Sequence, residues 1–93
     1  MRESTVERRL VEEVIRRGGS AYKFISPGCD GVPDRIVLFP EGKIAFVELK
    51  APGKVLRPLQ QKRKKDFEEL GQRVFVVDKV EMIGGVLDEI QTT

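Results

Sequence analysis

The sequence predicts one α/β domain in which helices flank a mixed β-sheet. Three observations point to this class. At 93 residues, the chain has room for a single hydrophobic core. Two runs rich in Ile, Val and Phe flank a short turn, which is typical of an antiparallel hairpin. A helical segment then separates the hairpin from another β-branched run, and such a crossover makes the connected strands parallel.

The first half of the chain is predicted to form one helix and three strands. The helix shows apolar residues at helical spacing and stops at Gly18-Gly19. The first strand ends at Pro27-Gly28, and a glycine-bearing loop follows. The other two strands flank Pro40-Glu41-Gly42, whose glycine can adopt the left-handed conformation. The predicted bounds are residues 4–17 for the helix and 21–26, 33–39 and 43–50 for the strands.

The second half is predicted to form a helix, a strand and a last helix. Pro58 suits the first position of a helix that runs to Leu70, with Leu59, Phe67 and Leu70 as a thin apolar stripe. Residues 74–77 read as a buried strand, and residues 80–90 as a helix weakened by Gly84-Gly85. The whole of residues 1–93 is thus one domain with the order α-β-β-β-α-β-α.

Composition excludes several classes of protein. One cysteine, Cys29, and no histidine argue against zinc enzymes, Ser/His/Asp triads and Cys/His nucleophile pairs. Apolar runs are far shorter than the ~18 to 20 residues of a membrane span, and the N-terminus lacks the features of a leader peptide. We therefore expect a cytoplasmic protein with no membrane partner.

The hairpin brings two carboxylates together. If Phe39 faces Lys43 across the turn, Asp34 lies directly opposite Glu48, with both side chains on one face of the sheet. Opposed Cβ atoms are only ~4.5 to 5.5 Å apart, and like charges at that distance repel unless a cation lies between them. An all-oxygen pair suits Mg²⁺, and Lys50 on the same face could hold water and offset phosphate charge. The competing interpretation is a solvated strand face in which Asp34 pairs with Arg35 or Lys50.

Glu7 and Gln60 are further candidates for this site. Glu7 falls near the middle of the apolar arc of the first helix, where it could ligate a metal ion. It could equally complete a capping box with Ser4, in which case it would not be a ligand. Gln60 lies in the first turn of the second helix, and could orient water or bind phosphate if that turn lies near the end of the strand that carries Glu48.

Basic residues suggest a polyanionic partner, although the net charge is only +2. Residues 50–65 hold seven cations and no acid, and the run 62–65 is either a solubilising helix surface or a track for a phosphodiester backbone. Asp30 and Cys29 read as ordinary loop residues. The candidate nucleic-acid contacts are Lys23, Arg35, Lys54, Arg57, Lys62 and Lys64.

These residues resemble a known family. Glu7, the segment Gly31-Val32-Pro33-Asp34-Arg35, the segment Phe46 to Gly53 and Gln60 stand in the order of the VRR-NUC family, the virus-type replication-repair nucleases of the PD-(D/E)XK superfamily. The resemblance covers nearly the whole chain, up to residues 74–77. It implies a restriction-endonuclease-like core and a nuclease dependent on Mg²⁺ or Mn²⁺.

The resemblance also implies roles for individual residues. Asp34 and Glu48 correspond to the main metal ligands, Lys50 to the catalytic lysine, Glu7 to the auxiliary acid and Gln60 to the helix glutamine near the scissile phosphate. Small members of the family look similar to phage proteins and are expected to be homodimers, akin to junction-resolving nucleases. The resemblance thus implies a bacterial or phage-infected cell and no organic cofactor. The expected activity is therefore structure-selective cleavage of branched DNA, either a junction or a flap. A non-catalytic nucleic-acid-binding module and a structural partner of a repair assembly remain the alternatives.

Overall fold

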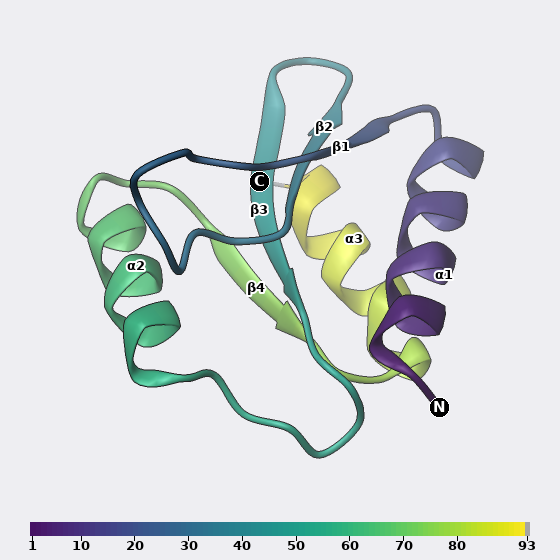
Figure 1. The fold of residues 1–93 in the computed structure, drawn as a ribbon. Helices are drawn as coiled ribbons and strands as arrows, with labels where there is room; N and C mark the ends of the chain where they lie inside the picture. The colour runs from purple at the N-terminus through teal and green to yellow at the C-terminus, as the bar shows by residue number, and fades with distance from the viewer. Residues whose placement is uncertain (93) are drawn as a thin grey trace.

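A four-stranded mixed sheet forms the centre of the molecule, in the order β1-β2-β3-β4. The computed structural model describes residues 1–92. Neighbouring strands are antiparallel except for β3 and β4, which are parallel and joined by α2 (Figure 1). The predicted fold class and element order are confirmed. The bounds are α1 Glu3–Arg16, β1 Ser20–Lys23, β2 Arg35–Phe39, β3 Lys43–Leu49, α2 Pro58–Glu69, β4 Val74–Val77, a 3-10 turn Val80–Met82, and α3 Ile83–Thr92.

The two faces of the sheet are covered differently. Alternating residues of β3, Ala45, Val47 and Leu49, are buried against α1 and α3 and form the main core with residues such as Leu10 and Leu87. The opposite face of β3 turns toward α2. Figure 1 shows α1 and α3 together on one side and α2 on the other.

Three aromatic rings attach α2 to the second face. Phe67 of α2 packs edge-on against Phe46 of β3 with ring centroids 4.9 Å apart, and Phe24 lies 5.7 Å from Phe46 and 6.1 Å from Phe67. No residue of α2 is fully buried, and Leu70, predicted as part of its apolar stripe, is exposed. The helix is therefore held at this cluster and not along a continuous apolar stripe.

The strand β1 is shorter than predicted and ends at Lys23. The Phe24 N–H still donates to the Asp34 carbonyl at 2.9 Å, so one backbone bond joins the two segments beyond Lys23. The backbone of Pro33 faces β3 and has no N–H to bond there, and β2 accordingly begins at Arg35 and not at the predicted residue 33.

The start of α1 corrects another prediction. The helix begins at Glu3 with Arg2 as its N-cap, and Arg2 makes no side-chain capping bond. Ser4 lies inside the first turn, so the proposed capping box of Ser4 and Glu7 is wrong. The carboxylate of Glu7 is consequently available for another partner.

The C-terminal segment also differs in detail from the predicted helix 80–90. Its first turn, Val80–Met82, is a 3-10 turn, and α3 then continues to Thr92 through both Gly84 and Gly85. Ile83, Leu87 and Ile90 are buried against the core, and this packing outweighs the low helix propensity of two glycines.

Gly19 is required by a close approach and not only as a helix stop. A Cβ at this position would lie 2.5 Å from the Leu38 carbonyl oxygen and 2.6 Å from the Phe39 ring. Glycine therefore lets the chain turn from α1 directly onto the edge of the sheet.

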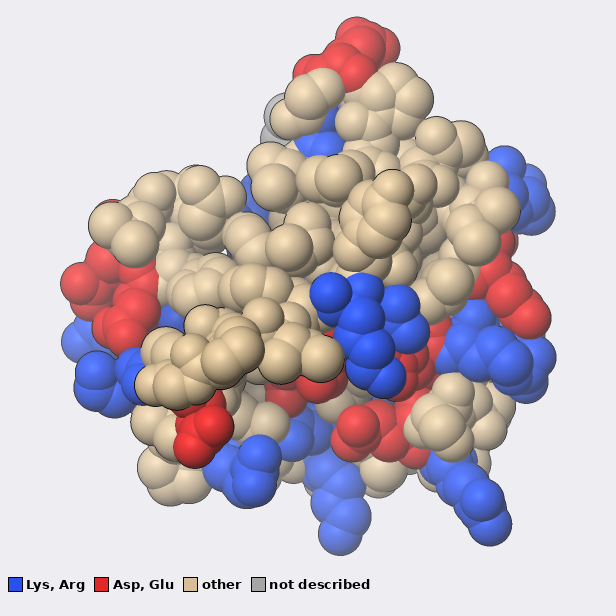
Figure 2. Space-filling model, turned by 45° about the horizontal axis from the view of Figure 1, so that its top comes forward, with Lys and Arg blue, Asp and Glu red and all other residues tan. Residues whose placement is uncertain are grey.

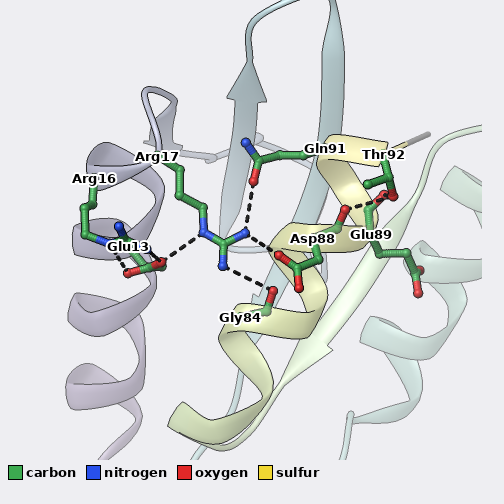
Figure 3. Close-up of polar contacts among 8 residues, drawn as sticks. All are labelled: Glu13, Arg16, Arg17, Gly84, Asp88, Glu89, Gln91 and Thr92. Carbon is green, nitrogen blue, oxygen red and sulfur yellow. Dashed lines mark hydrogen bonds and ion pairs between the residues drawn. The ribbon is translucent and has the colours of Figure 1, made fainter.

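Arg17 joins the two helices that cover the core face (Figure 3). Its guanidinium donates to Glu13 of α1 at 2.9 Å and to Asp88 of α3 at 2.8 Å. It also reaches the Gln91 side chain at 3.0 Å and the Gly84 carbonyl at 3.5 Å. No helix within residues 1–92 combines the length and apolar character needed to cross a membrane.

Candidate active site

The hairpin register places Asp34 beside Glu48, as predicted. Phe39 pairs with Lys43 and Arg35 pairs with Val47, so the next position in each strand brings Asp34 opposite Glu48. The Asp34 carboxylate accepts a hydrogen bond from the Leu49 N–H at 2.9 Å. This backbone donor, which no sequence motif reveals, fixes the Asp34 side chain against the end of β3.

Glu48 is a buried carboxylate with incomplete hydrogen bonding. Only 4% of the surface of Glu48 is exposed to solvent. Its Oε2 accepts from the Gln60 side-chain amide at 2.7 Å and lies 3.6 Å from the Lys50 ammonium, whereas Oε1 is buried and has no partner among the residues described. Burial, followed by repulsion from Asp34, raises the pKa of Glu48 to about 7, although Lys50 acts in the opposite direction.

These features fit a divalent cation. A buried carboxylate oxygen without a partner is unfavourable, and a second carboxylate beside it makes the electrostatic cost larger. A hard cation held by Asp34 and Glu48 would satisfy both, since carboxylate oxygens are the ligands that Mg²⁺ and Mn²⁺ favour. No third Asp, Glu or Cys joins them in a metal-binding group within residues 1–92.

Gln60 connects α2 to the carboxylate pair. Its side-chain oxygen accepts from the Arg57 N–H at 2.9 Å, so its amide nitrogen must face Glu48. The first turn of α2 therefore lies at the end of β3, as the role predicted for Gln60 requires. Lys64, four residues further along the same helix, lines a small cavity together with Glu48 and Gln60.

The side chain of Glu7 does not join the predicted metal ligands Asp34 and Glu48. Its Oε2 accepts from the Arg35 guanidinium at 2.9 Å, and both side chains are half-buried. Arg35 also donates to the Ala21 carbonyl at 3.0 Å. The pair thus ties α1 to β1 and β2, and it gives Arg35 an internal partner although the sequence suggested a nucleic-acid contact.

The predicted nucleic-acid contacts divide into two groups. Lys62 and Lys64 pair with Asp66 and Glu68 of the same helix, at 3.7 and 2.8 Å. Within the described part of the chain, Lys23, Lys54 and Arg57 are exposed and no carboxylate pairs with them. This second group is the one most accessible to phosphate. In the sequence, acids at positions 66, 68 and 69 follow the basic run closely, and this spacing could have indicated that its lysines would be paired.

Comparison with known proteins assigns the chain to a family. The family model described as the VRR-NUC domain matches residues 3–80. The chain belongs to the VRR-NUC family.

Two relatives agree with this assignment. A VRR-NUC relative, the "Putative nuclease p44" of Acyrthosiphon pisum secondary endosymbiont phage 1, is 49% identical over 82 residues, covering 88% of each chain. A solved structure described as a VRR_NUC domain superposes with a TM-score of 0.86 at 30% identity, covering 92% of this chain and 94% of that one. As a VRR-NUC protein, the chain is a nuclease, and its substrate is a nucleic acid.

Proposed function

We propose that this VRR-NUC protein hydrolyses DNA phosphodiester bonds with Mg²⁺ or Mn²⁺ bound by Asp34 and Glu48. The observation that carries the proposal is the buried Glu48 carboxylate. One of its oxygens has no partner among residues 1–92, and it lies beside Asp34, Lys50 and Gln60. A side chain in this state destabilises the fold unless it serves a bound cation. The activity belongs in the cytoplasm of a bacterial or phage-infected cell, where DNA is accessible.

Each side chain at the site has a separate role in the proposed reaction. When bound, the divalent ion supplies Lewis-acid polarisation of a phosphate oxygen. Lys50, whose ammonium is 3.6 Å from Glu48, is placed to hold the attacking water and to offset negative charge that develops on the phosphate. Gln60 holds the Glu48 carboxylate by the 2.7 Å hydrogen bond and keeps its orientation. Glu7 acts at a distance, because its bond to Arg35 fixes the strand residue that follows Asp34.

We infer that the DNA backbone is held by Lys23, Lys54 and Arg57, which have no carboxylate partner among residues 1–92. Lys62 and Lys64 contribute by exchanging their helix carboxylates for phosphate. Charge contacts of this kind carry no sequence preference, which agrees with a nuclease that recognises the shape of branched DNA.

We further propose that two copies of the chain form a homodimer. Tyr22, Leu38 and Ile44 are exposed on one face of the sheet, and we call them the apolar sheet patch. Leu38 pairs directly with Ile44, and the patch shares its face with Phe46 and Glu48. The upper side of the molecule, brought forward in Figure 2, carries a broad area of uncharged side chains. An apolar surface can pair with its own copy about a twofold axis, and two active sites would then serve the two strands of a junction.

The activity is tested with labelled duplex, single-stranded, flap and four-way DNA in Mg²⁺, in Mn²⁺ and in EDTA. We expect divalent-dependent cleavage of the branched substrates, and loss of at least about 100-fold in rate for Asp34→Asn, Glu48→Gln and Lys50→Met. Glu12→Gln, an exposed change on α1, is the control and should cleave normally. Cleavage that persists in EDTA contradicts the metal-dependent reaction. Salt-sensitive DNA binding without cleavage in either metal would instead favour the binding-module alternative.

A further inference from the structure

A cavity of about 510 Å³ opens beside the active site, at the first turn of α2. It shares Gln60 with the carboxylate site, since the same side chain donates to Glu48 at 2.7 Å. None of the roles proposed above uses this space. The residues that line it are Asp30, Gly31, Arg57, Pro58, Leu59 and Gln60.

The far wall of the cavity is held firmly against α2. Gly31 has φ +87°, and a Cβ there would lie 2.8 Å from the Leu59 carbonyl oxygen, so only glycine lets the loop approach this closely. Arg63 of α2 donates to the Asp30 carbonyl at 2.9 Å and fixes the same loop from the other side. The cavity thus lies beside α2 and the loop at Gly31, which contact each other directly.

The lining indicates what the cavity binds. Its volume lies within the range of sites for small organic molecules, which suits one nucleotide and is too small for a duplex. Arg57 supplies a positive charge without a carboxylate partner in residues 1–92, whereas Asp30 supplies a negative one. Phosphate is attracted to Arg57 and repelled by Asp30. Leu59, 41% exposed, and Pro58 offer apolar contact to a sugar or base.

We propose that this cavity is a subsite for one unpaired nucleotide next to the scissile phosphate. The proposal rests on the DNA hydrolysis proposed above, because Gln60 places the subsite beside the reacting phosphate. The backbone of the nucleotide lies toward Arg57, and its base packs against Pro58 and Leu59 in the cavity. A flap supplies such a nucleotide where it leaves the duplex, whereas a continuous duplex must first open a base pair. The subsite therefore provides a physical basis for preferring branched DNA.

The test measures binding without cleavage. A flap substrate carries the fluorescent base 2-aminopurine at successive unpaired positions near the branch, and the protein is added in EDTA. We expect a fluorescence change at one position with the natural chain, and about a fivefold or larger loss of affinity for Leu59→Ala, from the lost apolar contact. Leu70→Ala is the matched control, because Leu70 lies just past the other end of α2 and is 79% exposed. An abasic nucleotide at the responding position should weaken binding as much as Leu59→Ala does.

Cleavage assays in Mg²⁺ separate this proposal from the hydrolase proposal. Normal cleavage together with equal base fluorescence for the natural chain, Leu59→Ala and Leu70→Ala overturns the subsite and leaves the hydrolase intact. A position-specific fluorescence change that Leu59→Ala abolishes, without cleavage in either metal, overturns the hydrolase, and the cavity is then a nucleotide-binding site and not a subsite of cleavage. An abasic substrate that binds as tightly as the complete one also overturns the subsite. Absence of any DNA binding overturns both.

Discussion

Glu48 is a residue whose buried charge lowers the stability of the fold. Its carboxylate is withdrawn from water beside a second carboxylate, and one of its oxygens has no partner within the described residues. Lys50 and Gln60 compensate for only part of this cost. Strain of this kind is characteristic of residues kept for function, since an uncharged side chain of the same size would suit the fold better.

We therefore predict that Glu48→Gln stabilises the metal-free protein. The raised pKa of about 7 means that ionisation of Glu48 opposes folding, and the amide removes that charge. In EDTA at about pH 8, urea unfolding should give a free energy of unfolding higher by roughly 1–3 kcal/mol. In Mn²⁺ the natural chain should be more stable than Glu48→Gln, because the ion stabilises the natural chain by binding to its folded state. A variant less stable than the natural chain in EDTA would contradict this account.

Glu7 gives a second test at the scale of residues. Glu7→Ala leaves the half-buried Arg35 guanidinium without its carboxylate, and we expect a loss of about 1–3 kcal/mol in EDTA. Urea unfolding of Glu7→Ala, Arg35→Ala and the double variant measures their coupling. If Glu7 served only as a metal ligand, its removal would leave stability in EDTA unchanged and lower the affinity for Mn²⁺ alone.

At the scale of elements, the structure depends on a few side chains that join neighbouring helices. Arg17 contacts Glu13 on α1 and three groups on α3, and its side chain is only 18% exposed. The pair of Arg8 and Glu12 lies on α1 alone, with Arg8 62% exposed. Pairs of the second kind contribute little because water competes for both charges.

We predict that Arg17 contributes more to the stability of the fold than Arg8 does. Arg17→Met should lower the free energy of unfolding by about 1–3 kcal/mol, because it removes several partly buried bonds between α1 and α3. Arg8→Met, its matched control on the same helix, should change it by less than about 0.5 kcal/mol. Chemical denaturation of both variants provides the measurement. Equal effects would show that Arg17 does not join the helices in solution.

Glu13 adds a dependence on pH. Its bonds to Arg16 and Arg17 lower its pKa from 4.5 to about 2, so the unfolded chain binds more protons than the folded one between these values. The stabilisation is complete above pH 4.5 and is lost as the pH falls toward 2. Glu13→Gln should therefore be less stable than the natural chain at neutral pH, with a difference that shrinks below about pH 4. A difference that is constant with pH would contradict the lowered pKa.

At the scale of the whole molecule, the apolar sheet patch is an exposed surface on which two copies could meet. Leu38 and Ile44 are directly paired and each is a little over a third exposed, so a charge there can disrupt an interface without entering the core. We predict that Ile44→Glu converts a dimer into a monomer in analytical ultracentrifugation. Ile15→Glu, an equally apolar exposed position on α1, is the control and should leave the dimer intact. A natural chain that sediments as a monomer would contradict the dimer.

Much of this architecture could be predicted from the sequence. The alternation of β2 and β3 and the short turn between them determine the register, and the register alone places Asp34 opposite Glu48. Pro58 and Gly71 mark the limits of α2 to within one residue. Such features are local, because they depend on the spacing of residues a few positions apart.

Contacts between distant segments were decided only by the tertiary structure. Helical spacing put Glu7 toward the core but could not show that Arg35 would be its partner, 28 residues further on. The sequence left open whether the basic run on α2 is a solubilising surface or a phosphate track, and the structure pairs two of its lysines with acids of the same helix. The cavity between α2 and the loop at Gly31 has no sequence signature either. The sequence by itself determined the elements and the facing carboxylates, whereas the choice of partner for each charge depended on three-dimensional packing, because many pairings are compatible with one pattern of residues.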